Sequence, residues 1–179
     1  TSLTSPIPDI LMAPLSAINL SGVDYTKASN WFPTASRPEA KSKDSISSYF
    51  LSIPKLGIKE AVVSTTSDDL LKNLIHYSGS ELPGKSGNAV IFGHSTLPQF
   101  FDPKNYKTIF STLHTLKMGD TIIINVDGVT YKYSIFEIKV TEPQDISPLE
   151  QQYDNSYITL ITCTPPGTYW KRLNIKGRL

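Results

Sequence analysis

The sequence predicts a mainly β protein that folds as a closed or nearly closed β-barrel. Short apolar stretches of strand length recur along residues 48–179, and Pro, Gly, Asn and Asp punctuate them at regular intervals. Few stretches show the 3.6-residue periodicity of an amphipathic helix. Many short strands with few helices favour a barrel. A chain of 179 residues is long enough for one domain with a substantial core.

The first expected elements open this barrel. Residues 48–58 (SYFLSIPKLGI) and 59–63 (KEAVV) are strand-like and are joined by a Pro/Gly turn. Residues 68–76 (DDLLKNLIH) predict a short helix with Ser67 as its N-cap. Residues 88–94 (NAVIFGH) follow the turn-rich LPGKSG and have the apolar character of a buried strand.

The middle of the chain contains the strongest hairpin signal. Residues 121–126 (TIIINV) and 129–140 (VTYKYSIFEIKV) are strand-like, and Asp127 and Gly128 between them are typical of a two-residue hairpin turn. Residues 105–117 predict either a short helix or irregular turns.

The last expected elements are two strands that follow a long loop. Residues 142–156 predict a loop with one helical turn, and residues 157–163 (YITLITC) and 171–177 (KRLNIKG) predict strands. We expect these two strands to pair in antiparallel fashion through the Pro- and Gly-containing segment at 164–170.

Residues 1–47 have a different composition from the rest. They are rich in Ser, Thr, Pro and Ala and show little periodicity, which predicts a linker or an extended arm. Trp31, Phe32 and Pro33 form an apolar cluster within this polar stretch, and leaving them in water is unfavourable. A lid that packs on the barrel and covers a groove is therefore the alternative to a simple tether.

Composition excludes several classes of function. The formal net charge of +1 gives no electrostatic basis for binding nucleic acid or an anionic membrane. One cysteine cannot form an internal disulfide, and three histidines with one cysteine do not favour a structural zinc site. No acidic cluster predicts a calcium site, so we expect neither metal nor cofactor. No apolar run approaches the roughly 18 residues that span a bilayer.

The single cysteine, Cys163, ends an expected strand. Alternation places it on the same face as Ile161. In the following strand, Arg172 lies on the face opposite Leu173 and Ile175, which form an obvious core face. Antiparallel pairing would bring Cys163 and Arg172 side by side on the outer surface of the barrel. Both faces of the first strand carry apolar residues, so a buried core cysteine is the alternative.

This pair has the chemistry of a nucleophilic site. A nearby cation favours the thiolate of Cys163. The guanidinium of Arg172 can also hold the oxyanion of a tetrahedral intermediate, and the backbone N–H of Thr164 is a second candidate donor. Arg178 has the same strand parity, but it lies six residues further on, about 20 Å along an extended strand.

Acyl transfer also needs an acid for the leaving amine, and the chain has three histidines. His76 ends an apolar run and is typical of a structural residue, whereas His114 lies in a polar stretch and should be solvated. His94 closes an expected strand directly after Gly93, where a substrate backbone can approach. We therefore select His94 as the acid.

These residues together resemble the sortases, which are cysteine transpeptidases of the bacterial cell surface. The resemblance rests on TLITC at 159–163, on Arg172 nine positions after Cys163, and on GHS at 93–95. It covers roughly residues 48–178. It implies a closed barrel of about eight strands with short helices at 48–179, preceded by an N-terminal extension at 1–47.

The resemblance implies a mechanism and partners. Cys163 would attack an LPXTG-like sorting signal of a secreted protein and form a thioester, His94 would protonate the leaving amine, and Arg172 would hold the oxyanion. Thr162 and Thr164 would support this site. The acyl group would pass to an amine of a cell-wall precursor or of a pilin lysine.

The resemblance also implies a substrate groove and a location. The groove would be lined by the loops at 95–104 and 141–156, and its candidate residues beside the histidine are Gly93, Ser95 and Thr96. The protein would act at the extracellular face of the bacterial membrane, held by an anchor outside this sequence.

Both the class of sortase and the function itself remain open at this stage. TCTPPG is most similar to the pilin-polymerising class, but the N-terminal stretch has no Asp-Pro-aromatic element, so a housekeeping anchoring role is equally compatible. The alternatives to a sortase are a non-catalytic surface barrel that binds a partner and a hydrolytic cysteine peptidase. In peptidases of the papain type, however, the cysteine usually begins a helix and precedes the histidine.

Overall fold

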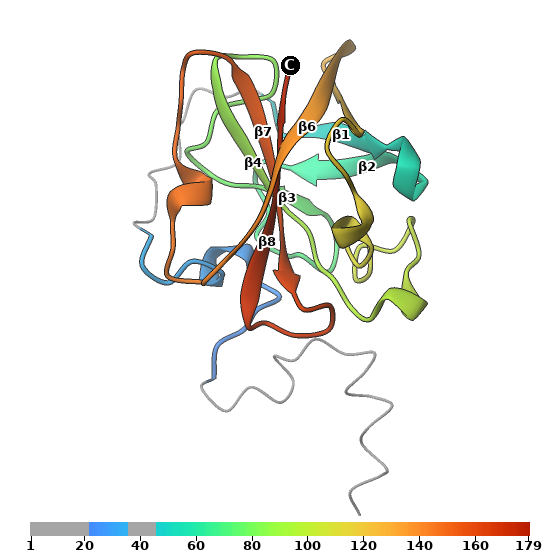
Figure 1. The fold of residues 1–179 in the computed structure, drawn as a ribbon, viewed down its shortest axis with the longest axis vertical. Coiled ribbons are helices and arrows are strands. Elements are labelled where there is room, and N and C mark those ends of the chain that lie inside the picture. The colour runs from blue at the N-terminus through green and yellow to red at the C-terminus, as the bar shows by residue number, and fades with distance from the viewer. Residues whose placement is uncertain (1–21, 36–45) are drawn as a thin grey trace, which may run out of the picture.

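A computed structural model describes residues 22–35 and 46–179 of the chain. In these ranges eight strands form one closed barrel, and the only helices are short 3-10 turns (Figure 1). The strands are β1 Ser48–Ile53, β2 Ile58–Ser64, β3 Leu74–His76, β4 Gly87–Phe92, β5 Thr121–Val126, β6 Val129–Thr141, β7 Ser156–Thr164 and β8 Lys171–Arg178. The 3-10 turns are η2 Ala28–Asn30, η3 Pro54–Leu56, η4 Pro98–Phe100, η5 Leu113–Thr115 and η6 Ser147–Leu149.

The strand order around the barrel is β1-β2-β3-β4-β7-β8-β6-β5. The pairs β2/β3 and β4/β7 are parallel, and the other pairs are antiparallel. Closure leaves no long unpaired edge, which is how an all-β domain avoids pairing with other chains. The β7–β8 loop and the C-terminus lie at opposite ends of the barrel (Figure 1).

Strand alternation fills the barrel with apolar side chains. In β7, Ile158 and Leu160 point inward into the main core, whereas Ile161 and Cys163 belong to a second cluster on the outside. In β8, Leu173 and Ile175 join the main core. The inside-outside assignment expected from the period of two is therefore confirmed for both strands.

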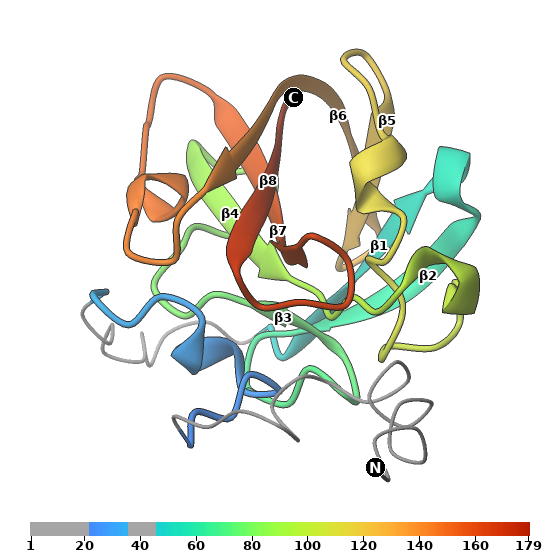
Figure 2. The same cartoon turned by 60° about the horizontal axis from the view of Figure 1, so that its bottom comes forward.

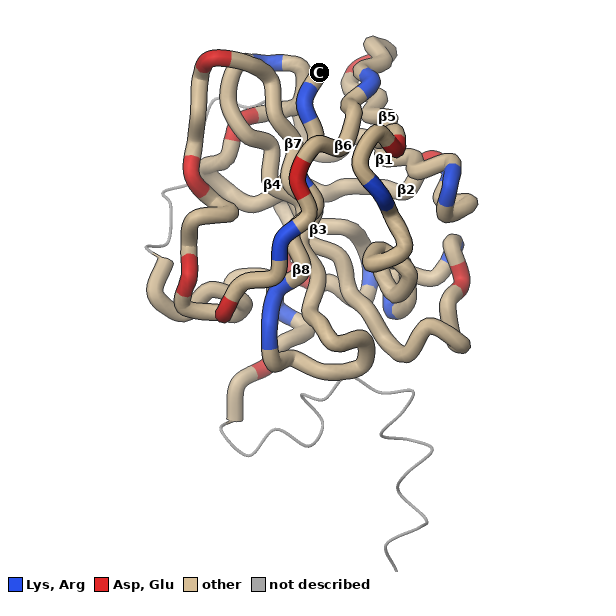
Figure 3. Tube along the Cα trace, in the orientation of Figure 1, with Lys and Arg blue, Asp and Glu red and all other residues tan. Residues whose placement is uncertain are grey.

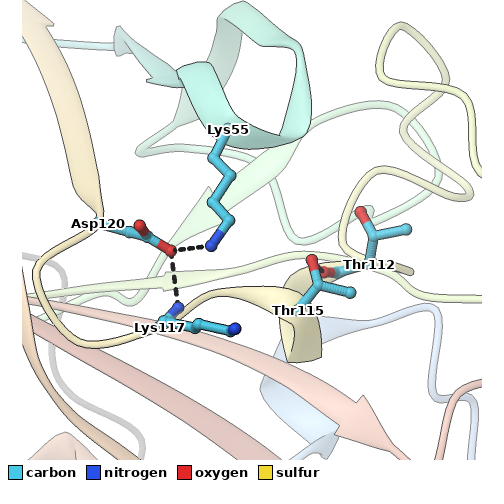
Figure 4. A network of polar contacts seen from close by, with 5 residues as sticks. All are labelled: Lys55, Thr112, Thr115, Lys117 and Asp120. Atoms are coloured by element: carbon cyan, nitrogen blue, oxygen red, sulfur yellow. Dashed lines mark hydrogen bonds and ion pairs between the residues drawn. The ribbon is translucent and has the colours of Figure 1, made fainter.

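The hairpin expected between β5 and β6 is present. Asp127 and Gly128 both have positive φ, at 51° and 80°, as a hairpin turn of the I′ type requires. The turn at 117–120 is tied to the β1–β2 connection by Asp120, whose carboxylate accepts hydrogen bonds from the Lys55 ammonium and from the backbone N–H of Lys117 (Figure 4).

The prediction of a helix at residues 68–76 is wrong. Residues 74–76 form β3, and the residues before them form turns in which Ser67 accepts a hydrogen bond from the N–H of Asp69. The N–H of Leu70 instead donates to the carbonyl of Thr26. Pairing with β2, β4 and the N-terminal segment overrides the local helical pattern here, because strand pairing satisfies the same backbone groups within the barrel.

Residues 22–35, called the N-terminal segment below, run along the outside of the barrel. Figures 1 and 2 both show this blue segment beside the end of the barrel that carries the β7–β8 loop. Ser29 fixes it through hydrogen bonds from its N–H and hydroxyl to Asp68, and Trp31 and Phe32 are buried. None of the helices in the described ranges has the length and apolar character needed to cross a membrane.

Candidate active site

Cys163 and Arg172 are directly opposite each other on β7 and β8. Both side chains lie on the outer face of the barrel, and an Nη of Arg172 lies 3.5 Å from the thiol sulfur. The expected pairing is therefore confirmed. The expectation of an exposed pair is not, because Cys163 is 2% exposed and Arg172 is 1% exposed.

The N-terminal segment covers this pair. Trp31 and Phe32 pack with Cys163 and Ile161 in the second apolar cluster, and both rings contact Phe92 of β4. The indole N–H of Trp31 donates to the carbonyl of its own segment's Tyr25, so no buried donor of this ring lacks a partner. The aromatic pair singled out in the sequence thus fills the outer surface of β4 and β7 next to the cysteine.

The guanidinium of Arg172 is held by backbone carbonyls. Its Nε and one Nη donate to the carbonyl of Trp31 at 3.1 and 2.9 Å, and the other Nη donates to the carbonyls of Tyr169 and Lys171. Among the described residues no carboxylate forms an ion pair with it. A buried cation without a counter-ion is costly, so a thiolate or an oxyanion beside it would be stabilised.

Three aromatic rings complete the surroundings of Arg172. The centroids of Tyr25, Trp31 and Phe32 lie 5.9, 5.6 and 6.0 Å from its guanidinium carbon. These rings all belong to the N-terminal segment. Their faces partly replace the solvation that the cation loses on burial.

Burial controls the protonation of Cys163. It raises the pKa of the thiol to about 12, and the neighbouring positive charge of Arg172 lowers it only in part. With the N-terminal segment in place the cysteine is therefore a neutral thiol at neutral pH. A thiol is a much weaker nucleophile than a thiolate.

His94 lies two residues beyond the end of β4 and is 1% exposed. Its Nδ1 contacts the carbonyl of Lys107 at 2.8 Å, which requires an N–H on this nitrogen, and its Nε2 contacts the hydroxyl of Tyr169 at 3.3 Å. Burial lowers the pKa of His94 to about 4, although the hydrogen bond to Lys107 acts in the opposite direction. Among the described residues no hydrogen bond joins His94 to Cys163.

The backbone around His94 runs beside the end of β7. The N–H of Gly93 donates to the carbonyl of Ile161, and the hydroxyl of Thr162 donates back to the carbonyl of Gly93. The hydroxyl of Ser95 donates to the carbonyl of Cys163. These cross-links place the histidine loop against the cysteine strand, so Cys163, Arg172 and His94 come to the same end of the barrel.

The remaining candidate residues have mainly structural surroundings. A Cβ on Gly93 would lie 2.2 Å from Phe110, so the space that the sequence assigned to a substrate backbone is filled by this ring. Thr96 is buried, and its N–H donates to Ser111. Thr164 ends β7 opposite Lys171.

Tyr169 and Tyr25 were not among the residues selected from the sequence. Their rings stack with centroids 4.6 Å apart, and Tyr169 also contacts His94 edge-on. Tyr25 thus connects the N-terminal segment to the histidine through the β7–β8 loop. Only the aromatic composition of these two stretches hinted at such a contact. Within residues 22–35 and 46–179, no three His, Cys, Asp or Glu side chains gather as a metal site.

The family is decided by a comparison with family models. The model described as the sortase domain matches residues 51–179. The chain belongs to the sortase family. Sortases are cysteine transpeptidases that act on sorting signals, and the family is extracellular.

Solved sortase structures of several classes resemble this sortase. A sortase D5 transpeptidase of Clostridium perfringens is 31% identical, with a TM-score of 0.62 and coverage of 79% of this chain and 82% of that one. A pilus-related sortase C of Group B Streptococcus is 29% identical, with a TM-score of 0.64 and coverage of 83% and 78%. Sortase A from Corynebacterium diphtheriae is 28% identical, with a TM-score of 0.62 and coverage of 96% and 78%. A search of curated proteins found no match.

Proposed function

We propose that this sortase uses Cys163 to cleave an LPXTG-like sorting signal and to transfer the acyl group to an amine. The observation that carries the proposal is the pairing of Cys163 with Arg172, whose Nη lies 3.5 Å from the sulfur. Arg172 has no carboxylate partner among the described residues, so its positive charge is available to a thiolate and to an oxyanion.

The reaction has two covalent steps. His94 takes the proton of the Cys163 thiol as the sulfur attacks the scissile carbonyl and a C–S bond forms. It delivers the same proton to the leaving amine as the C–N bond breaks. An acceptor amine then attacks the thioester, a C–N bond forms, and the C–S bond breaks. His94 takes the proton that the attacking nitrogen loses and returns it to the sulfur of Cys163. Thr162 supports this arrangement through its hydrogen bond to the carbonyl of Gly93.

The sorting signal binds on the outer surface of β4 and β7, next to the cysteine. This surface carries Val90, Phe92 and Ile161 and is apolar, as the leucine and proline of such a signal require. Trp31 and Phe32 now cover it. Ser95 and Thr96 flank the surface near His94.

The N-terminal segment acts as a lid in this proposal. With the lid closed, Cys163 is a neutral thiol and the carbonyl of Trp31 takes the hydrogen bonds that Arg172 would give to the substrate oxygen. The structure of a lid mutant of the Corynebacterium diphtheriae sortase A, 30% identical over 94% of this chain, has also been solved. The protein would act at the extracellular face of the bacterial membrane.

A peptide assay tests the proposal. The intact chain is incubated with a fluorogenic LPXTG-type peptide and with glycine- and lysine-type amines that mimic a cell-wall precursor and a pilin lysine. Mass spectrometry should detect a thioester on Cys163 and an amide product with one amine class. The variant Cys163→Ala should keep its fold and form neither. Normal turnover by this variant would overturn the proposal.

A further inference from the structure

A pocket lies on the outer face of the barrel, one residue row away from Cys163 and Arg172. Its volume is about 220 Å³. Its lining comes from strands β6, β7 and β8 and from the β6–β7 loop, residues 142–155. We call it the charged pocket. Its lining residues are Glu137, Lys139, Ser147, Pro148, Glu150, Gln152, Thr159, Asn174 and Lys176.

Strand register places this pocket relative to the reaction centre. Thr141, Arg172 and Cys163 form one row across the three strands. Asn174 lies in the next row, and Lys176 lies in the row after that, opposite Glu137. Two residues of strand span about 7 Å, so the pocket begins about 7 Å and ends about 14 Å from the row of Cys163.

The β6–β7 loop separates this pocket from the apolar surface assigned to the sorting signal. Leu149 packs against the second apolar cluster, whereas Pro148 and Glu150 line the charged pocket. The loop is fixed because the side-chain amide of Asn88 donates to the carbonyls of Pro148 and Glu150. The enzyme therefore has two preformed surfaces beside one nucleophile.

The pocket is lined by side chains of both charges, and these side chains form no ion pairs among the described residues. The loop carries four acidic residues and no basic one, and Figure 3 shows both signs along β6 and β8. Glu137, Lys139, Glu150 and Lys176 take part in none of the ion pairs among the described residues. The ammonium of Lys176 lies 5.0 Å from the ring centroid of Tyr157, which holds it at the edge of the pocket.

One buried polar atom in the lining has no partner. The Oδ1 of Asn174 is buried and accepts no hydrogen bond within the described part of the chain. The orientation of this amide is fixed, because its Nδ2 donates to the carbonyls of Lys139 and Arg172 and to the hydroxyl of Thr141. A flip would turn an oxygen toward two carbonyl oxygens. An N–H donor near the floor of the pocket would satisfy Oδ1.

We propose that the charged pocket binds the far end of the peptide that serves as acyl acceptor, a segment with a free carboxylate and an ammonium group. The carboxylate faces Lys139 and Lys176, and the ammonium faces Glu137 and Glu150. The attacking amine of the same peptide lies about two to four residues away, since an extended chain spans about 3.3–3.6 Å per residue. This inference rests on the proposed transpeptidase function.

Acceptor kinetics test the assignment. The intact wild-type chain is acylated with the LPXTG-type peptide, and the acceptor is varied among Gly-Gly-Gly-Lys, its C-terminal amide, Gly-Gly-Gly-norleucine and glycinamide. We expect the KM of Gly-Gly-Gly-Lys to be at least fivefold lower than that of each of the other three. The variants Glu150→Gln and Lys176→Gln should remove this advantage while the KM of glycinamide stays unchanged. Glu142→Gln, in the same loop but outside the pocket, should retain the advantage.

A binding measurement separates the pocket from the chemistry. In Cys163→Ala, Gly-Gly-Gly-Lys should shift the side-chain amide resonance of Asn174 in a nitrogen-proton correlation spectrum, and Glu150→Gln should weaken this binding at least fivefold. If the wild type forms no thioester, the proposed function fails. If the thioester forms but all four acceptors have equal KM, or if Nα-acetyl-lysine amide reacts as well as Gly-Gly-Gly-Lys, the pocket assignment fails and the proposed function stands.

Discussion

The guanidinium of Arg172 donates two hydrogen bonds to the backbone carbonyl of Trp31, a residue 141 positions earlier in the chain. The same guanidinium contacts the sulfur of Cys163. A carbonyl oxygen of the N-terminal segment thus occupies the donors that the proposed function assigns to a substrate carbonyl. In that proposal the two oxygens compete for one arginine, and opening of the segment frees its donors.

Opening of the segment should activate the thiol. Trp31→Ala removes a fully buried indole, and truncations of this kind cost about 3–5 kcal/mol of packing. Cys163 then regains contact with water, and its pKa falls from about 12 toward 9.0. We expect alkylation by iodoacetamide at pH 7.5 to become at least tenfold faster, with an unchanged circular dichroism spectrum of the barrel.

The matched control for this experiment is Thr34→Ala. Thr34 belongs to the same segment, but it is exposed and its hydroxyl donates to the carbonyl of Gln144. In this variant the thiol of Cys163 should react with iodoacetamide at the wild-type rate. Equal alkylation rates in the two variants would show that the segment does not limit access to the cysteine.

The geometry of Arg172 should matter beyond its charge. Arg172→Lys keeps a cation but loses the planar fork that reaches the thiol and the neighbouring carbonyls together. We expect cleavage of the LPXTG-type peptide to fall by about 10²–10³, the usual loss for an oxyanion donor. A drop of less than threefold would indicate that Arg172 acts only as a distant charge.

The burial of His94 should make the fold acid-sensitive. Its folded pKa of about 4 lies below the ordinary 6.5, so the unfolded chain binds more protons between these values. Stability is therefore fully present above pH 6.5 and is lost as the pH falls toward 4. The loss from this residue is at most about 3 kcal/mol, at roughly 1.4 kcal/mol for each pH unit.

Urea unfolding at a series of pH values measures this effect. The variant His94→Asn should show a smaller fall in unfolding free energy between pH 6.5 and 4 than the wild type. Parallel pH profiles for the two proteins would show that another group carries the acid sensitivity.

Gly93 should be required for packing. A Cβ there would lie 2.2 Å from the ring of Phe110, which is itself buried. Gly93→Ala should therefore lower the unfolding free energy by about 1–3 kcal/mol, as overpacked cores do. In a Phe110→Leu background the same change should cost less than it does in the wild type, measured by thermal unfolding. An equal cost in both backgrounds would rule out this steric explanation.

Much of the barrel could be predicted from the sequence. Apolar and polar residues alternate clearly in 171–177, and a period of two assigns each side chain of 157–163 and 171–177 to a face regardless of distant contacts. The hairpin at Asp127 and Gly128 is equally local, because two residues with positive φ specify the turn. By contrast, residues 68–76 carry an ambiguous apolar pattern, and contacts with β2, β4 and Thr26 decided their conformation.

The sequence by itself determined the pairing of Cys163 with Arg172, since one cysteine, strand parity and a short connection leave few other arginine partners for Cys163. Only the tertiary structure decided how that pair is solvated. Trp31 and Tyr25 reach Arg172 and Tyr169 from more than 130 positions away, and no local pattern specifies such a contact. The charged pocket has the same origin, because its residues come from three strands and one loop that only barrel closure brings together.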